Sequence, residues 1–205
     1  MIPIQNVYYM LSYAFQVLNE QGYKNIATEQ FHNTGELMAA ILEKGIAIQL
    51  KRGLGKEYIP QTEELSSLRG KIDIAESIKT QSMLRKQLIC TYDEFSVNST
   101  MNRIIKSTAA LLLRSNISKQ RKKNLRKLMM YFGEVDFIDL HTVNWNVQYN
   151  RNNQTYRMLI SVCYLVVKGL LQTQSDGSTQ LMDFLDEQRM CRLYEKFILE
   201  YYRKE

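Results

Sequence analysis

The stretch that decides the fold is RGKIDIAESIKTQSMLRKQLICTYDEFSVNSTMNRIIKSTAALLLR, residues 69 to 114. It begins with a glycine-containing turn at Arg69-Gly70, continues through a short amphipathic segment, and alternates apolar with polar side chains from Leu88 to Phe95. Alternation with a period of two predicts a strand, whereas the apolar residues after Asn98 recur at helical spacing. Asparagine is also a favourable helix N-cap. The stretch therefore predicts a β-to-α junction at the centre of the fold.

Most of the remaining chain is predicted to be helical. Asn33, followed three residues later by Glu36, resembles a capping arrangement that opens a helix, and Gly45 is expected to weaken the end of that helix. Other segments with helical periodicity are residues 5–19, 74–84, 125–132, 156–171 and 187–205. The segment 156–171 is apolar nearly all round, so we expect it to be the most buried helix.

The most β-like part outside the junction is the segment from Gly53 to Ile72. Lys56–Thr62 and Ser66–Ile72 are predicted to pair as a hairpin with Glu63-Glu64 near its turn, and Pro60 places the first of them at a sheet edge. An exposed acidic turn of this kind is either a protein-contact element or a solvated loop. The predicted fold class is α+β, predominantly helical with a small β-hairpin or sheet.

Composition limits the class of protein. A chain of 205 residues with 45% hydrophobic and 23% charged residues has the profile of one folded globular domain, or one domain and part of a second. No apolar run reaches the roughly 18 residues needed to span a membrane, and the N-terminus lacks the features of a secretory signal. Cys90, Cys163 and Cys191 form no metal-binding spacing, so we expect buried free thiols in a reducing cytoplasm.

The main electrostatic feature is the segment from Arg114 to Lys127, which holds seven basic residues and no acidic one in a chain of net charge +6. Basic side chains on one surface bind DNA phosphates without regard to sequence. The candidates for this contact are Arg121, Lys122, Lys123 and Arg126. The alternative is a solvated connection between two helices.

No catalytic centre is predicted in this chain. Nucleases that use divalent metals commonly hold the ion with an Asp and an Asp/Glu-x-Lys motif, and no acidic residue here is followed two positions later by lysine. Phosphate-binding glycine loops are also missing, and His32 and His141 are isolated in the sequence. We therefore assign no catalytic residue, metal ligand or cofactor to this chain.

Five motifs in order carry a family resemblance. They are I-P-I-Q-N-V-Y-Y-M-L-S-Y-A-F near the start, R-G-K-I-D-I with C-x-Y-D-E-F-S-x-N, N-R-I-I-K-S-T, Y-N-R-N-N-Q-T-Y-R, and L-Y-E-K-F near the end. Together they resemble the McrC component of McrBC-type, methylcytosine-dependent restriction systems. The residues that carry the resemblance most directly are Arg69, Gly70, Asp93, Asn98, Asn102, Arg103, Arg151, Asn152 and Arg157.

The resemblance implies a two-part protein. Its N-terminal region would engage and stimulate the AAA+ GTPase McrB, and its C-terminal region would be a Mg²⁺-dependent nuclease of the PD-(D/E)xK type. On this basis residues 1–179 would engage an McrB-like partner, with DNA contacted in the complex. Residues 180–205 would begin the nuclease domain, with Glu195 on its first helix supporting the metal site. Because the catalytic motif is absent, either the chain is truncated or a second polypeptide supplies the nuclease core. The alternative function is that of a stand-alone basic DNA-binding protein.

Overall fold

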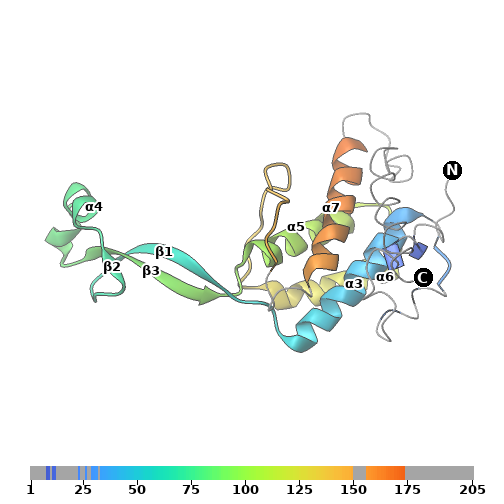
Figure 1. Ribbon diagram of the computed structural model, residues 1–205, viewed down its shortest axis with the longest axis horizontal. Coiled ribbons are helices and arrows are strands. Elements are labelled where there is room, and N and C mark those ends of the chain that lie inside the picture. The colour runs from blue at the N-terminus through green and yellow to red at the C-terminus, as the bar shows by residue number, and fades with distance from the viewer. Residues whose placement is uncertain are drawn as a thin grey trace, which may run out of the picture. The chain divides into compact units, whose positions relative to one another are not determined.

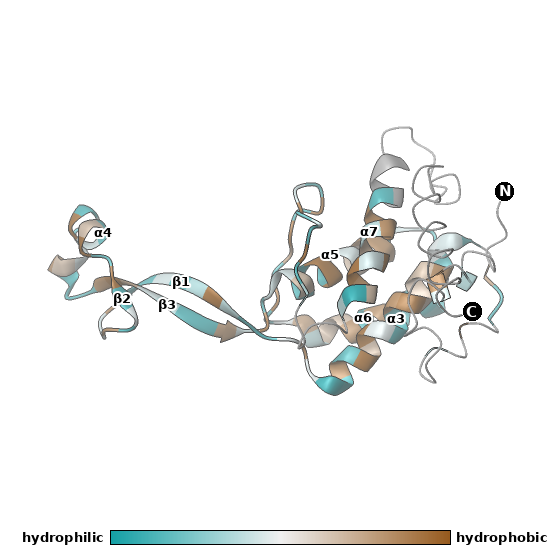
Figure 2. Cartoon of the chain, in the orientation of Figure 1, coloured by the Kyte–Doolittle hydropathy of each residue, from teal (hydrophilic) through white to brown (hydrophobic). Residues whose placement is uncertain are grey.

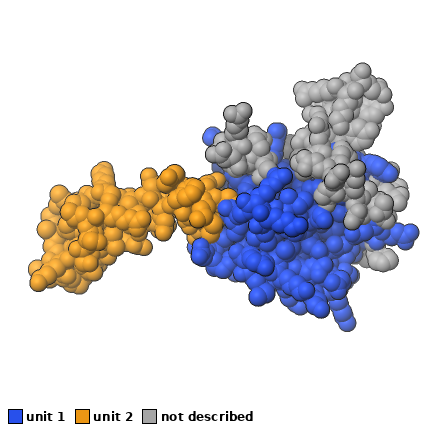
Figure 3. Space-filling model, turned by 90° about the horizontal axis from the view of Figure 1, so that it is seen from below, with its two compact units in different colours: residues 1–54, 101–205 blue, residues 55–100 orange. Residues whose placement is uncertain are grey.

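The computed structural model describes residues 8, 9, 11, 12, 23, 26, 29–31, 33–149 and 156–173, without the side chains of 169–173. The chain forms two compact units, shown by colour in Figure 3. Unit 1 comprises residues 1–54 and 101–205, and unit 2 comprises residues 55–100. The predicted turn at 150–153, the helix at 187–205 and the boundary at 179/180 lie outside the described residues.

Helices make up most of the described part of unit 1 (Figure 1). They are α3 (Thr34–Arg52), α5 (Thr100–Arg114), α6 (Lys119–Met129), the short 3-10 helix η3 (Met130–Phe132) and α7 (Tyr156–Thr173). Figure 2 shows that many residues of α3, α5 and α7 are hydrophobic. The largest fully buried side chains come from several of these helices and include Leu37, Ile41, Ile104, Leu112, Leu125 and Phe132. Much of α7 is buried, including Met158, Leu159, Val162, Cys163 and Val166, but α3 buries as large a share of its residues, so α7 does not stand out as the most buried helix.

Helix α3 begins as predicted and ends later than predicted. The Asn33 side chain accepts a hydrogen bond from the Glu36 backbone N–H at 2.7 Å, which confirms the N-cap. The expectation that Gly45 weakens the helix end is wrong, because α3 continues to Arg52. A Cβ at Gly45 would lie 2.2 Å from Cδ2 of Leu159. The glycine therefore allows α3 and α7 to approach closely.

Unit 2 contains a three-stranded antiparallel sheet in the order β1-β3-β2. Its strands are β1 (Glu57–Leu65), β2 (Lys71–Ile72) and β3 (Leu88–Ser96). The predicted hairpin is wrong, because β1 runs through Glu63-Glu64 without turning and pairs along its whole length with β3. This register places Tyr58 opposite Phe95 and Thr62 opposite Thr91, and such cross-strand pairs stabilise a sheet. Pro60 lies in an edge strand, as predicted.

Between β2 and β3 the chain forms two short helices where one was predicted. Helix α4 (Ile74–Lys79) is capped by Asp73, and the 3-10 helix η2 (Ser82–Arg85) follows after Gln81, whose φ of 56° interrupts the helix. The buried Ser77 hydroxyl donates to the Asp73 carbonyl at 2.6 Å and accepts from the Ile89 N–H at 2.8 Å. These bonds tie α4 to β3.

The β-to-α junction is confirmed, since β3 leads to α5 through a short connection. Its predicted position at the centre of the fold is wrong, because the chain passes from unit 2 to unit 1 at this junction. The capping position of α5 falls on Ser99, one residue after the predicted Asn98. The basic segment is not a connection between helices. Its greater part forms α6, which is capped by Ser118 and begins well before the predicted Leu125.

Candidate functional site

The Arg69-Gly70 motif builds a tight corner beside β3. Gly70 has φ of +67°, and a Cβ there would lie 2.4 Å from the Thr91 carbonyl oxygen. The Arg69 guanidinium lies 3.8 Å from the centre of the Tyr92 ring. The Tyr92 hydroxyl donates to Glu63 at 2.8 Å, and this bond is the main reason that the pKa of Tyr92 is raised. The motif therefore fixes how the chain enters β2.

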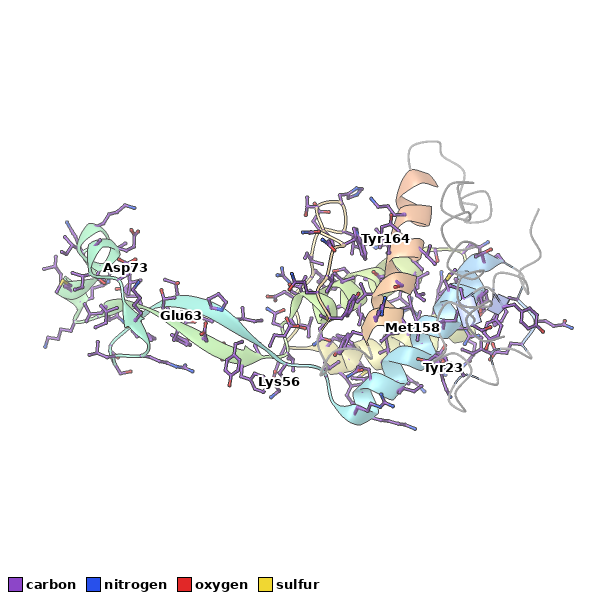
Figure 4. All side chains as sticks on the ribbon, viewed as in Figure 1. Tyr23, Lys56, Glu63, Asp73, Met158 and Tyr164 are labelled. Carbon is purple, nitrogen blue, oxygen red and sulfur yellow. The ribbon has the colours of Figure 1, made fainter. Side chains whose placement is uncertain are left out.

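A second feature of unit 2 is its exposed apolar side chains on α4 and η2. We call the group Ile74, Ile78, Met83 and Leu84 the α4–η2 surface; their exposed fractions run from 54% to 81%. The buried side chains of this unit are few: those of Ile89, Cys90 and the three serines Ser77, Ser82 and Ser99. Figure 4 labels Asp73 at the start of α4 and Glu63 on β1. The Glu63-Glu64 segment, which the sequence indicated to be either a protein-contact element or a solvated loop, lies in the same unit.

Strand pairing and polar bonds outside the α4–η2 surface contribute to the stability of this unit. Arg85 binds both carboxylate oxygens of Glu64, at 2.7 and 2.9 Å from Nη2. The hydroxyls of Thr62 and Thr91 lie 3.0 Å apart across the strands. The apolar residues of the α4–η2 surface are therefore not needed to cover a core.

The N-R-I-I-K motif of α5 lies in unit 1 and has a structural role. Asn102 is fully buried and accepts a hydrogen bond from the Tyr156 hydroxyl at 2.8 Å, which joins α5 to the start of α7. Arg103 donates to the Phe137 carbonyl at 3.3 Å. Lys106 donates to the carbonyls of Phe132 and Val135, 2.8 Å from the first. The motif thus holds the chain that follows α6.

The other motif residues are scattered. Asp93 is exposed on β3, and the Asn98 N–H donates to the Ser96 hydroxyl at 3.1 Å. Arg157 is exposed on α7. Arg151, Asn152 and Glu195 lie outside the described residues. The described motif residues are thus divided between unit 2, which holds Arg69, Gly70, Asp93 and Asn98, and unit 1, which holds Asn102, Arg103 and Arg157.

Arg121 lies at the centre of an ion-pair cluster between α6 and α3. Its guanidinium donates to Glu29 at 2.7 Å and to Glu43 at 3.0 Å, and Nε lies 3.5 Å from Glu36. Burial acts to lower the pKa of Arg121, but the bonds to Glu43 and Glu29 outweigh it and raise the pKa above its ordinary value. Only 17% of the side chain is exposed. Arg121 is thus engaged internally and is the weakest of the predicted phosphate-binding residues.

Glu36 links the starts of both helices. Its carboxylate accepts hydrogen bonds from the Ser118 N–H at 2.8 Å and the Ser118 hydroxyl at 2.7 Å, while the same hydroxyl accepts from the Arg121 N–H at 3.2 Å. The residue predicted to belong to the cap of α3 therefore supports the cap of α6. The capping pattern at Asn33 and Glu36 correctly predicted where α3 begins. It did not indicate that the Glu36 side chain binds Ser118.

The opposite face of α6 is basic. Lys119, Lys123, Arg126 and Lys127 are exposed, and Lys122 is half-buried. DNA binding by Lys122, Lys123 and Arg126 stays a prediction.

The described residues carry no group of three or more potential metal ligands. Cys90 and Cys163 are buried and free, as predicted, and burial raises the pKa of Cys163 to about 12. This thiol is therefore not a nucleophile near neutral pH. Within the same described ranges, no helix is both long and apolar enough to cross a membrane.

Comparison with known proteins places these features in a family. The chain is 31% identical over 213 residues to the type IV methyl-directed restriction enzyme EcoKMcrBC of Escherichia coli (strain K12), covering 100% of this chain and 60% of that protein. It is similar to a chain in the cryo-EM structure of the Thermococcus gammatolerans McrBC complex, with a TM-score of 0.62, 21% identity and coverage of 98% of this chain and 57% of that one. A second similar structure is a refined half-complex from the tetradecameric assembly of Thermococcus gammatolerans McrB AAA+ hexamers with bound McrC. That match has a TM-score of 0.56 and 21% identity over 80% of this chain and 42% of the other.

The chain thus spans 60% of the length of the Escherichia coli relative and 57% of the solved Thermococcus chain. Residues 4–205 match the sequence family described as the McrBC 5-methylcytosine restriction system component. The five motifs predicted this assignment, and the match confirms it over nearly the entire sequence. The chain belongs to the McrBC 5-methylcytosine restriction system component family.

Proposed function

We propose that this chain is an McrC-like subunit that binds an AAA+ GTPase of its restriction system through the α4–η2 surface and raises the partner's GTP turnover. One observation carries the proposal. Four large apolar side chains of α4 and η2 are more than half exposed, although polar pairs outside this surface already stabilise unit 2. Exposed apolar groups that a fold does not need are typical of protein-binding surfaces.

The nature of the partner follows from the family. One similar structure is described as containing McrB AAA+ hexamers with bound McrC. If the present chain forms an equivalent complex, its binding surface should bury apolar side chains at the centre and leave charged residues at the rim. Ile78 and Leu84 suit the centre, and Lys79 and Arg85, with exposed or paired charges, suit the rim.

Stimulation of GTP hydrolysis requires no catalytic group from this chain. A subunit that binds one conformation of a GTPase preferentially shifts the population toward that conformation. No metal-ligand cluster exists among the described residues, so we assign no step of DNA cleavage to them.

The test combines the purified chain with its cognate McrB-like GTPase and measures GTP turnover and the mass of the complex. We expect the chain to raise turnover and to add to the mass of the partner. The double variant Ile78→Gln, Leu84→Gln should lose both effects, because glutamine fits a helix but removes the apolar contact.

Lys71→Gln is the matched control, since it introduces the same residue at an exposed position of β2 in the same unit and leaves the α4–η2 surface and its charged rim intact. It should behave like the unmodified chain. A double variant that still binds and stimulates normally would reject the α4–η2 surface as the contact. If the unmodified, folded chain changes neither the GTP turnover nor the mass of the GTPase, the proposal that it binds and stimulates this partner is rejected.

A further inference from the structure

The exposed face of α6 is a candidate surface that the partner contact does not use. Residues i, i+4, i+7 and i+11 of a helix lie on one face. Lys119, Lys123, Arg126 and Met130 follow this spacing. The opposite face, with Arg121 and Leu125, packs inward.

The charges of this region are segregated by face. Arg121 lies on the inner side of α6. It forms ion pairs with the carboxylates of Glu29, Glu36 and Glu43. The outer face carries cations and no acidic residue from Lys119 to Lys127. The next carboxylate along the chain is Glu134, beyond η3. The positive potential of the outer face is therefore not neutralised from within α6.

Arrangement as well as charge favours a polyanion. The cations form a row about 12 Å long, given a rise of roughly 1.5 Å per residue. A regular row of cations matches the dense, uniform charge of duplex DNA, whereas an acidic protein surface would favour isolated, geometrically specific ion pairs.

We propose that this face, comprising Lys119, Lys122, Lys123, Arg126 and Lys127, binds the phosphate backbone of duplex DNA without sequence preference. The family is that of a 5-methylcytosine restriction system, so DNA is the polyanion at hand. Contacts to phosphate position a protein on the duplex, while base contacts specify sequence. The surface would hold DNA against the subunit and leave recognition of the modified base to other parts of the system. It lies in unit 1 and is independent of the proposed partner contact.

The experiment measures binding of the full chain to a fluorescein-labelled 20-base-pair duplex of arbitrary sequence by fluorescence anisotropy over a range of salt. With four to five phosphate contacts, log Kd should change with log salt with a slope of about 4, so raising salt fourfold should weaken binding by about two orders of magnitude. The triple variant Lys123→Gln, Arg126→Gln, Lys127→Gln should weaken binding at least about tenfold near 100 mM salt and lower the slope by about three.

The control variant Lys51→Gln, Arg52→Gln, Lys79→Gln makes the same change in net charge at exposed residues elsewhere. It should retain affinity within about threefold and keep the salt slope. Circular dichroism and thermal unfolding should show both variants folded, since all six positions are exposed.

Three outcomes would overturn the proposal. They are undetectable binding by the unmodified chain, equal loss in both triple variants, and competition by polyglutamate as strong as that by unlabelled duplex. The last result would identify the face as a site for an acidic protein. None of them bears on the GTPase contact, because the α4–η2 variants are measured separately.

Discussion

Two glycines show how far a single residue can be understood from the sequence. Gly70 was predicted to form a turn, and its positive φ agrees with that prediction. Gly45 was predicted to weaken a helix, and instead it provides space for Leu159. The difference lies in the range of the interaction: a turn is local, whereas the neighbour of Gly45 is distant in the sequence. A glycine at helical spacing does not reveal which side chain fills the space beside it.

Replacing Gly70 by alanine should destabilise the β2–β3 pairing. The added methyl group would approach the Thr91 carbonyl, in a backbone region where a side chain alone costs roughly 1–2 kcal/mol. Hydrogen exchange at the β3 amides should become at least about tenfold faster, since 1.4 kcal/mol corresponds to a factor of ten. Gly53→Ala is the control, because Gly53 also has positive φ but no atom within 4 Å. Unchanged exchange of β3 in Gly70→Ala would contradict this view of the corner.

At the scale of elements, local signals identified helices but not their partners. The cap at Asn33, the strand at Leu88–Phe95 and the β-to-α junction were predicted from short patterns. The hairpin was wrong because the choice between β2 and β3 as the partner of β1 depends on pairing over long sequence distances. Similarly, the basic segment was visible in the sequence, but the carboxylates that draw Arg121 inward come from α3 and from Glu29.

The α3–α6 cluster gives a prediction at this scale. Arg121→Met should lower the thermal unfolding midpoint by several degrees, because it leaves Glu36 and Glu43, whose side chains are 12% and 19% exposed, without their cation. Discounting for this partial exposure, we expect a loss of about 2 kcal/mol, or roughly 4–8 °C for a chain of this size.

Lys122→Met is the control on the same helix. It should change the midpoint by less than about 2 °C, because no ion-pair cluster depends on it. The two variants should also differ in DNA binding, with a lower salt slope in Lys122→Met and an unchanged one in Arg121→Met. Equal midpoints for the two variants would show that the cluster does not stabilise the α3–α6 contact.

The whole molecule consists of two units that differ in how they are stabilised. Unit 1 buries large apolar side chains between its helices, whereas unit 2 relies on strand pairing and polar contacts and leaves apolar residues exposed. The sequence predicted the α+β class and the family. It did not predict the α4–η2 surface, because exposed and buried apolar residues look alike in a sequence until their neighbours are known.

The most direct test of the central claim is hydrogen–deuterium exchange of the full chain with and without its cognate McrB-like GTPase. Residues 74–85, which hold α4 and η2, should become protected in the complex, while the amides of α6 should exchange as they do in the free chain. Protection confined to α6, or no protection anywhere under conditions in which the complex forms, would contradict the account.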